Sequence, residues 1–295
     1  MIKSGFVAII GKPNVGKSSL LNKLIGEKIA ITSPTPETTR NRILGALTTN
    51  EYQIIFVDTP GMGKNFNLLS KKLTEVSKAS MDDNDVIYYV VDRKYHESQK
   101  EVIEYFKEHQ LKVFLVINKI DLMKTKEIDE IIISYMNLYD FQAFVPVSSI
   151  TGQNLDKLIE LTLEELPEDG LLFPKDFVSN QTERMRMMEL IREKILLHTK
   201  EEIPHSVAVV IENVFYNEEL DQYDVYADIL VEKSSQKQIL IGKNGEKIKT
   251  IGTAARLDIN KTLKTKVHLV LWVKVKKDWR NDERMLTNLG IGEDY

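Results

Sequence analysis

Short, nearly continuous apolar runs recur along the first half of the chain, separated by longer segments of helical periodicity. The clearest runs are FVAII (6–10), IIFVD (54–58), VIYYVVD (86–92) and VFLVIN (113–118). A strand with one solvated face alternates apolar and polar residues, so continuous runs indicate strands buried on both faces. The run FVPVS (144–148) contains a proline, which favours an edge position. Strands that alternate with helices predict an α/β fold, a mostly parallel sheet with helices on both faces.

A change of pattern near residue 166 predicts the end of this first unit. Residues 155–163 (LDKLIELTL) indicate a closing amphipathic helix. The next stretch, LPEDGLLFPKD (166–176), contains two prolines and a glycine and is the best candidate for a linker. We therefore predict two domains, one over residues 1–170 and one over residues 171–295.

The second domain has a different order of elements. The predicted elements are a helix over 183–198, strands over 206–214 and 223–232, a short helix, a helix over 246–261, a strand over 267–275 and a short helix over 282–289. This order predicts a smaller α+β domain.

The composition restricts the class of protein. The chain of 295 residues contains no Cys, which excludes disulfides, thiolate metal sites and catalytic thiols and suits a reducing cytosol. No apolar run approaches the ~18 residues that a membrane span requires, so no transmembrane segment is expected. The run at 6–10 leads into Gly11 and is too short for a signal peptide. We expect a cytoplasmic protein; peripheral contact with the inner face of the cell membrane stays open.

The charges are distributed unevenly along the chain. The net charge is -4, yet residues 231–280 contain thirteen Lys or Arg against four Asp or Glu. This segment has an excess of nine positive charges, and the rest of the chain carries about thirteen negative ones. Such an asymmetry indicates a local basic surface, which is either a solvated face or a nucleic-acid-binding surface.

The segment GKPNVGKS, residues 11–18, matches the phosphate-binding pattern G-x-x-x-x-G-K-[ST]. It follows a predicted strand and precedes a predicted helix, as the pattern requires. The glycines let backbone N–H groups turn toward phosphate oxygens, and the start of the helix adds a positive dipole. Lys17 would contact the β- and γ-phosphates, and the Ser18 hydroxyl would ligate Mg²⁺. The expected nucleotide contacts here are Gly11, Asn14, Val15, Gly16, Lys17, Ser18 and Ser19.

Two further segments complete the predicted metal and phosphate site. In DTPG (58–61), Asp58 ends a strand and can hold a Mg²⁺-bound water, while the Gly61 N–H can contact the γ-phosphate. The loop 28–42, rich in Thr and Pro, is expected to be a switch that closes over the nucleotide. Thr39 is the preferred second Mg²⁺ ligand in this loop, with Thr38 as the alternative.

The base-recognition residues follow two later strands. In NKID (118–121), the Asp121 carboxylate can accept hydrogen bonds from N1–H and the N2 amino group of guanine, a donor pair that adenine lacks. Asn118 and the stem of Lys119 would frame the base. The expected contacts to guanine O6 are the backbone N–H groups of Ser148, Ser149 and Ile150. The four segments in this order predict a GTPase, not an ATPase or a kinase.

One of the usual catalytic residues is missing from this pattern. Some GTPases place a water-orienting glutamine directly after the glycine that corresponds to Gly61, but here the position is Met62. We therefore expect slow intrinsic hydrolysis, with the water positioned by backbone, a second hydrated ion or a partner. Lys17, Thr39 and Gly61 are the expected catalytic groups. Asn14 is either a turn residue or a ligand that helps hold K⁺ near the phosphates.

A second glycine-containing segment, IGKNGEKIKTIG (241–252), lies in the basic region. It lacks the G-K-[ST] ending and lies between helical patterns, so it is not a second nucleotide loop. A G-x-x-G loop between two helices is typical of KH domains, here of type II, which clamp about four nucleotides of single-stranded RNA. The apolar Ile241 and Ile248 form either the groove floor or part of the core. The expected RNA contacts are Ile241, Gly242, Lys243, Asn244, Gly245, Lys247, Ile248, Lys249 and Arg256.

The joined motifs resemble the Era family of bacterial ribosome-assembly GTPases. The resemblance runs nearly end to end, through GKPNVGKSSLLN, TTRNR, DTPG, NKID and VPVSSITG, then IREKILLHTKEEIPHSVAV, IGKNGEKIKTIG and VHLVLWVKVKKDWRNDERML. It implies a GTP-dependent switch whose KH domain binds the 3′ end of small-subunit ribosomal RNA during maturation of the small ribosomal subunit. It also implies a hydrophobic residue at position 62, as Met62 is. Ile150 departs from the polar residue common there, with little effect expected because the backbone makes that contact.

Two other classes of function remain as alternatives. One is an RNA-binding module with an inert nucleotide fold, which the intact Lys17, Ser18, Asp58 and Asp121 argue against. The other is a GTPase of RNA modification or membrane transport, disfavoured by the KH segment and by the lack of Cys, membrane spans and a modification motif. The expected partners are therefore GTP and GDP, small-subunit ribosomal RNA and the small ribosomal subunit.

Overall fold

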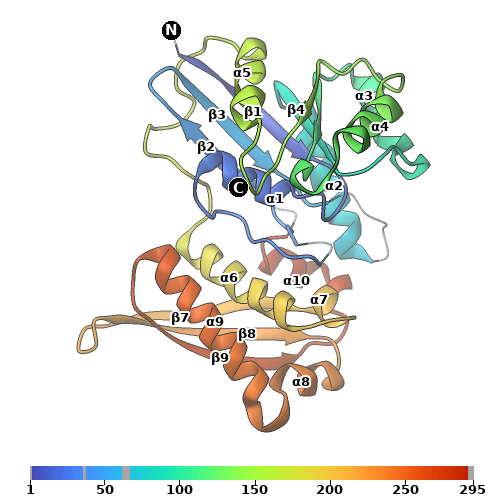
Figure 1. The fold of residues 1–295 in the computed structure, drawn as a ribbon. Coiled ribbons are helices and arrows are strands. Elements are labelled where there is room, and N and C mark those ends of the chain that lie inside the picture. Colours follow the sequence, from blue (N-terminus) through green and yellow to red (C-terminus); the bar gives the residue numbers. More distant parts are fainter. Residues whose placement is uncertain (1, 36–37, 62–66, 292–295) are drawn as a thin grey trace.

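The computed structural model describes residues 2–35, 38–61 and 67–291, and it contains two units, each built on its own sheet (Figure 1). The first sheet contains β1 (Lys3–Ile10), β2 (Ile43–Thr48), β3 (Tyr52–Asp58), β4 (Val86–Val91), β5 (Val113–Ile117) and β6 (Ala143–Pro146). Its order is β2-β3-β1-β4-β5-β6, and all neighbours are parallel except β2 and β3. The parallel sheet is confirmed, and the proline-containing strand β6 lies at an edge as predicted.

Helices cover both faces of this sheet. They are α1 (Lys17–Ile25), α2 (Leu68–Asp82), α3 (Lys100–His109), α4 (Thr125–Tyr135) and α5 (Leu155–Glu165), with 3-10 turns η1 (Glu97–Gln99) and η2 (Ile120–Leu122). Val7 and Ile9 of β1 pack in one apolar cluster with α1 and α5, whereas Ala8 and Ile10 pack in another with α3 and α4. This double burial explains why the strands are continuously apolar.

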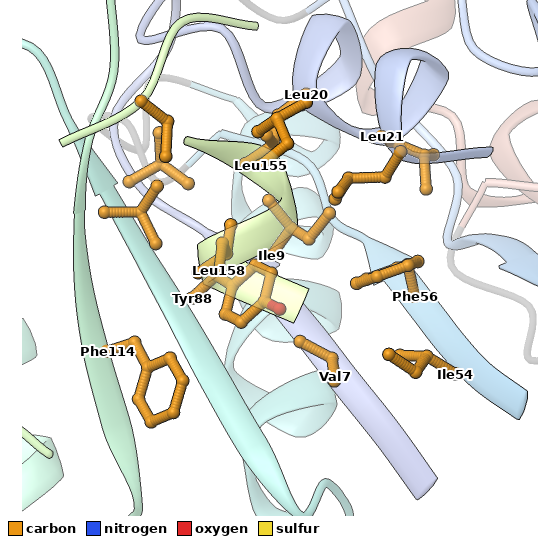
Figure 2. Packing of buried hydrophobic residues seen from close by; sticks show 14 of the residues in the cluster. Val7, Ile9, Leu20, Leu21, Ile54, Phe56, Tyr88, Phe114, Leu155 and Leu158 are labelled. Carbon is orange, nitrogen blue, oxygen red and sulfur yellow. The ribbon is translucent and has the colours of Figure 1, made fainter. Parts of the chain in front are cut away.

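Figure 2 shows the cluster on the α1 and α5 face. Leu20 and Leu21 of α1 and Leu155 and Leu158 of α5 lie in one apolar layer with Tyr88 and the side chains of the neighbouring strands. The Tyr88 hydroxyl lies 2.5 Å from the Thr162 hydroxyl, which satisfies the polar end of the ring. The packing fixes β1 relative to α1, and with them the loop between these two elements.

The second unit contains a three-stranded sheet whose longer helices lie on one face (Figure 1). Ala208 and Leu230, on the opposite face, pack with Trp279 and Leu286 near the end of the chain. Its elements are α6 (Glu183–His198), α7 (Ile203–Ser206), β7 (Ala208–Asn217), β8 (Gln222–Val231), α8 (Ser234–Ile241), η3 (Lys243–Gly245), α9 (Glu246–Leu263), β9 (Val267–Val275), η4 (Trp279–Asn281) and α10 (Glu283–Asn288). The order is β7-β8-β9, with β7 and β8 antiparallel and β8 and β9 parallel. Ile251, Ala255 and Ile259 of α9 are fully buried in its core, at the four-residue spacing of one helix face. The predicted α+β order is confirmed.

Apart from the 3-10 turns, two elements were not predicted from the sequence, β2 and α7. β2 contains Gly45 and Thr48, and it is an antiparallel edge strand, so it lacks the continuous apolar signal of the parallel strands. The proposed linker also contacts the first sheet, since Leu172 and Phe173 donate their N–H groups to Gln53 Oε1 at 2.8 and 2.9 Å. Residues beyond α5 pack along β2, where Ala46 donates its N–H to the Val178 carbonyl at 2.9 Å and Leu44 donates to Asn180 Oδ1 at 3.0 Å.

Apolar and polar contacts join the two units. Leu69 and Leu73 of α2 pack in one cluster with Trp279, Leu286 and Leu289. The Trp279 side chain is fully buried there, which makes it a central residue of this contact.

Over the described ranges, we find no helix whose length and apolar content would suit it to cross a membrane.

Candidate functional site

The predicted phosphate loop connects β1 to α1, at the carboxyl end of the parallel strands. Gly11 and Gly16 have φ values of +148° and +96°, which L side chains rarely adopt. A Cβ at Gly11 would lie 2.3 Å from the Val90 carbonyl oxygen, and one at Gly16 would lie 2.3 Å from Asn118 Nδ2. Glycine is therefore required at both positions for two reasons, because the backbone has a positive φ and because a side chain would clash. The loop brings successive backbone N–H groups to the start of α1.

Lys17, the first residue of α1, points its ammonium group back into this loop. Its Nζ donates to the Gly11 and Lys12 carbonyls at 3.0 and 3.1 Å. Burial lowers the pKa of Lys17 to about 8, and the nearby Asp58 carboxylate opposes the shift. Because this ammonium group is desolvated, the negative charge of a bound phosphate would stabilise its protonated form strongly.

The three predicted metal ligands converge on one point. The Ser18 hydroxyl donates to Asp58 Oδ2 at 2.8 Å and lies 2.8 Å from Thr39 Oγ1, which also donates to Asp58 Oδ2 at 3.2 Å. Thr38, the alternative, instead donates its hydroxyl to the Thr35 carbonyl at 2.7 Å. The geometry therefore favours Thr39 over Thr38, although the two are adjacent in sequence.

The donor set fits Mg²⁺. Asp58 is fully buried, and its Oδ1 has no hydrogen-bond partner among the described residues. Burial raises the pKa of Asp58, while Lys17 and the two hydroxyls oppose this shift. An oxygen-only cluster with one buried carboxylate oxygen still unsatisfied is what a hard divalent cation or its bound water would complete.

Gly61 lies against the phosphate loop, where a Cβ would meet Pro13 atoms at 3.0–3.1 Å. Met62, the position of the missing glutamine, lies outside the described residues. Between the loop and the switch segment is a cavity of about 290 Å³. Its lining includes predicted contacts from several segments, namely Asn14, Gly16, Lys17, Ser18, Ser19, Thr39, Gly61 and Lys119.

Asn118 ties the base-recognition end to the phosphate loop. Its Nδ2 donates to the Val15 carbonyl at 2.9 Å and to the Ser149 hydroxyl at 3.1 Å, and its Oδ1 accepts the Ser149 N–H at 3.0 Å. The side chain is fully buried, so Asn118 is a structural bridge between three loops. The Ser149 N–H, expected to contact guanine O6, is already bonded within the protein.

Asp121 is oriented by a neighbouring hydroxyl. Ser148 Oγ donates to Asp121 Oδ1 at 2.6 Å and also accepts the Ile150 and Thr151 N–H groups at 3.3 and 3.1 Å. Asp121 itself is exposed, so its second oxygen faces outward from this network. A fixed carboxylate at the mouth of a site can accept a pair of donors from a base edge.

Asp92 is a site residue that the sequence interpretation missed. Its carboxylate accepts from Lys119 Nζ at 2.7 Å, and the same ammonium donates to the Asn14 carbonyl at 2.6 Å. Burial alone would raise the pKa of Asp92, but hydrogen bonds from Arg93 and Lys119 hold it below its usual value. The signal was available, because Asp92 ends a predicted strand as Asp58 does.

The second glycine loop lies between α8 and α9, at the end of the second unit that is remote from the first sheet (Figure 1). Gly242, Asn244 and Gly245 all have positive φ, at 72°, 51° and 79°. A Cβ at Gly242 would lie 2.7 Å from the Lys247 Cβ, whereas one at Gly245 would meet nothing within 4 Å. Gly242 thus permits close packing, and Gly245 permits the turn into α9.

The predicted RNA contacts around this loop are largely accessible. Lys243, Asn244, Lys249 and Arg256 are exposed, and Lys247 is half-buried. Ile241 and Ile248 are also half-buried and pack against the core cluster of the second unit. Both alternatives for these two isoleucines therefore hold in part, since each joins the core and retains some exposed surface.

Two family models match the chain. The model described as 50S ribosome-binding GTPase matches residues 6–119, and the model described as KH domain matches residues 202–280. Curated relatives named GTPase Era, from Thermoanaerobacter pseudethanolicus and Geobacter metallireducens, are each 44% identical to this chain. The alignments cover 99% and 98% of this chain, and 97% of each relative.

Two solved structures match the whole architecture with a TM-score of 0.93, covering 99% of this chain and 100% of their own. One is a variant of Aquifex aeolicus Era bound to GDP and AlF4⁻, at 38% identity. The other is Era in complex with MgGDPNP and nucleotides 1506–1542 of 16S ribosomal RNA, at 37% identity. Similarity at this level over nearly the whole chain shows that the protein belongs to the Era family of GTPases, enzymes that hydrolyse GTP to GDP and phosphate.

Proposed function

We propose that this GTPase is a switch that binds the 3′ end of small-subunit ribosomal RNA through its second domain and assists maturation of the small ribosomal subunit. The observation that carries the RNA assignment is the glycine loop between α8 and α9, with Lys243 and Asn244 exposed, in a chain whose fold matches that of Era solved with such RNA. Glycines in this loop allow a phosphodiester backbone to approach closely, and the lysines beside it can neutralise phosphates.

The nucleotide is held by the residues gathered at the carboxyl ends of the first sheet. Backbone N–H groups of residues 14–19 and the Lys17 ammonium bind the phosphates, and the Asp121 carboxylate selects guanine. Ser18 and Thr39 would hold Mg²⁺ directly and Asp58 through water, and the ion would neutralise charge on the phosphate oxygens. The Gly61 N–H contacts the γ-phosphate, which couples hydrolysis to the position of the following segment.

Asn14 is proposed to help hold K⁺ near the phosphates. The residue has a φ of +65°, and its Nδ2 donates to the Pro34 carbonyl at 2.6 Å, which links the phosphate loop to the switch segment. A monovalent cation at this junction would add positive charge where the sequence offers no glutamine at position 62. GTP turnover is expected to be several-fold faster in KCl than in NaCl at matched ionic strength, and equal rates would remove K⁺ from the proposal.

The domain boundary is proposed within residues 166–176, between a GTP-binding domain over 1–170 and a KH domain over 171–295. The proposal is supported by the two separate sheets and by the end of α5 at Glu165. We also propose a cytoplasmic location, because the chain lacks Cys and its proposed partner is ribosomal. The described residues offer no support for the peripheral membrane contact that the sequence left open.

A pair of variants separates the two binding activities. Lys17→Ala removes the buried cation and should abolish GTP binding while RNA affinity stays within about twofold. Gly245→Asp strains the backbone at a φ of +79° and adds a negative charge, so RNA affinity should fall at least tenfold with GTP binding unchanged. Gly170→Asp is the matched control, since Gly170 has a φ of +84° with equally open space. Unchanged RNA affinity in Gly245→Asp would remove the RNA clamp from the proposal.

A further inference from the structure

Two adjacent charged residues of α6, in the second unit, contact the switch loop of the first. Arg192 and Glu193 are each only 2% exposed, and both face the segment 28–42. Buried charges are costly unless they are paired, so their partners identify what these side chains hold in place.

Glu193 holds the first part of the loop. Its Oε1 accepts the Thr32 backbone N–H at 3.0 Å, and its Oε2 accepts from Lys28 Nζ at 2.6 Å. Lys194 adds a second ammonium at 3.1 Å from Oε2. The carboxylate therefore accepts from three donors, two of them from the loop of the other unit.

Arg192 holds the second part of the loop. Its Nη2 donates to the Thr38 backbone carbonyl, and its Nε and Nη2 donate to the Glu189 carboxylate at 2.9 and 2.6 Å. The pair with Glu189 fixes the guanidinium plane on α6, so the contact to Thr38 is made by a rigid donor.

The Arg192 contact is one residue away from the metal cluster. Thr39 follows Thr38 directly, and its hydroxyl lies 2.8 Å from Ser18 Oγ and 3.2 Å from Asp58 Oδ2. A peptide whose carbonyl is held on one side has little freedom to move the next side chain. The position of Thr39 thus depends on a donor that belongs to the other domain.

These polar contacts are separate from the apolar contact between the units. Leu69 and Leu73 pack with Trp279 at a different part of the interface, and Leu68 donates its N–H to Asn281 Oδ1 at 3.1 Å. Arg40, which lies in the loop itself, donates to the Val207 carbonyl at 2.7 Å and is a further contact between the loop and the second unit. The domains therefore have an attachment that does not require α6 charges. Arg192 and Glu193 can act on the loop without being needed for docking.

We propose that Arg192 and Glu193 are positioning residues of the GTPase site, supplied by the second domain, which hold Lys28, Thr32 and Thr38 of the switch loop so that Thr39 meets Ser18 and Asp58. The inference rests on the metal-ligand role proposed above for Thr39. Neither residue touches the nucleotide; both act through the loop. GTP hydrolysis accordingly depends on the second domain being docked, and binding of GDP, which lacks the γ-phosphate that orders such loops, does not.

The test uses the full chain and compares Arg192→Ala, Arg192→Lys, Glu193→Gln and Thr39→Ala with the control Glu183→Gln, an exposed residue in the first turn of α6. We expect kcat for GTP to fall about tenfold or more in Arg192→Ala and Glu193→Gln, since small displacements of a catalytic group have effects of this order. GDP affinity should stay within twofold, which also reports correct folding. Arg192→Lys should recover part of the rate, because lysine retains one charged donor.

A second readout does not involve catalysis. In the nucleotide-free protein, the Thr32 amide should exchange its hydrogen about tenfold faster or more in Glu193→Gln than in Glu183→Gln, because it loses a charged acceptor. If Arg192→Ala does not fold, Arg192→Lys and Glu193→Gln carry the test.

The outcomes distinguish this inference from the proposed function. A slow Thr39→Ala variant together with normal kcat in the α6 variants would overturn the positioning role alone. Normal kcat in Thr39→Ala would overturn both the metal-ligand assignment and the positioning role. Loss of kcat with unchanged GDP affinity and faster Thr32 exchange supports the inference.

Discussion

The Asp121 carboxylate offers the sharpest test of base recognition. We predict that Asp121→Asn exchanges the preference for guanine for a preference for xanthine. Ser148 Oγ donates to Asp121 Oδ1 at 2.6 Å, and this bond decides how an asparagine would sit. The hydroxyl would hold the amide oxygen, so the NH₂ group would take the place of Oδ2.

The magnitude follows from the hydrogen bonds that change. An asparagine NH₂ directed at the guanine N2 amino group places donor against donor, and the remaining bond loses its charge. Hydrogen bonds to charged groups contribute ≈1.5–3 kcal/mol each, so a loss of about 3 kcal/mol is expected, or roughly 150-fold in Kd. Xanthine has a carbonyl at the same position and can accept from the NH₂ group, so the binding of XTP should improve by a similar factor.

The assay is competition of GTP and XTP against a fluorescent guanine nucleotide for the wild type and Asp121→Asn. Ser148→Ala is the matched control, because it removes the orienting hydroxyl and leaves the carboxylate. It should weaken both nucleotides by roughly fivefold, about 1 kcal/mol, without exchanging the preference. If Asp121→Asn retained the wild-type preference for GTP over XTP, the assignment of Asp121 to the base would be wrong.

Two further predictions concern the phosphate loop. With a pKa of about 8, Lys17 is mostly protonated at pH 7 and about half protonated at pH 8, so GTP binding should take up about half a proton at pH 8 and about a tenth at pH 7. Calorimetry in buffers of different ionisation enthalpy measures this, and equal uptake at both pH values would refute it. The pH dependence of folding has the opposite sign. Between about pH 8 and 10.5 the unfolded chain binds more protons at Lys17 than the folded chain does, so the contribution of Lys17 to folding stability rises with pH. Over the same range the affinity for GTP falls. Gly16→Ala should weaken GTP binding at least tenfold, because a Cβ would lie 2.3 Å from Asn118 Nδ2 at a φ of +96°; wild-type affinity in a nucleotide titration would show that the loop tolerates the side chain.

The parts of the fold that the sequence predicts are those with a local cause. The runs at 6–10 and 54–58 are continuously apolar because each strand is buried on both faces, and this is visible without the structure. β2 was not predicted, because an antiparallel edge strand has a weaker apolar pattern. Its Gly45 is explained only by packing, since a Cβ there would lie 2.5 Å from Ile29 Cδ1.

The same distinction applies to the site. Residues 11–18 and 118–121 are contiguous motifs whose chemistry follows from spacing. Thr39 and Thr38 are adjacent and chemically alike, so only the structure distinguishes them, by placing the Thr39 hydroxyl beside Ser18. The contact of Arg192 with the switch loop joins residues 154 positions apart and depends on how the domains dock, so no local pattern could have shown it.

The proposed RNA contact joins the loop between α8 and α9 to the 3′ end of small-subunit ribosomal RNA. Cross-linking of the tagged protein to RNA in cells, with the bound sequences determined, tests it most directly. We predict cross-links concentrated at the 3′ end of small-subunit ribosomal RNA, reduced at least tenfold in Gly245→Asp and retained in Gly170→Asp. Cross-links spread over unrelated RNA, or unchanged in Gly245→Asp, would contradict this assignment of the RNA contact.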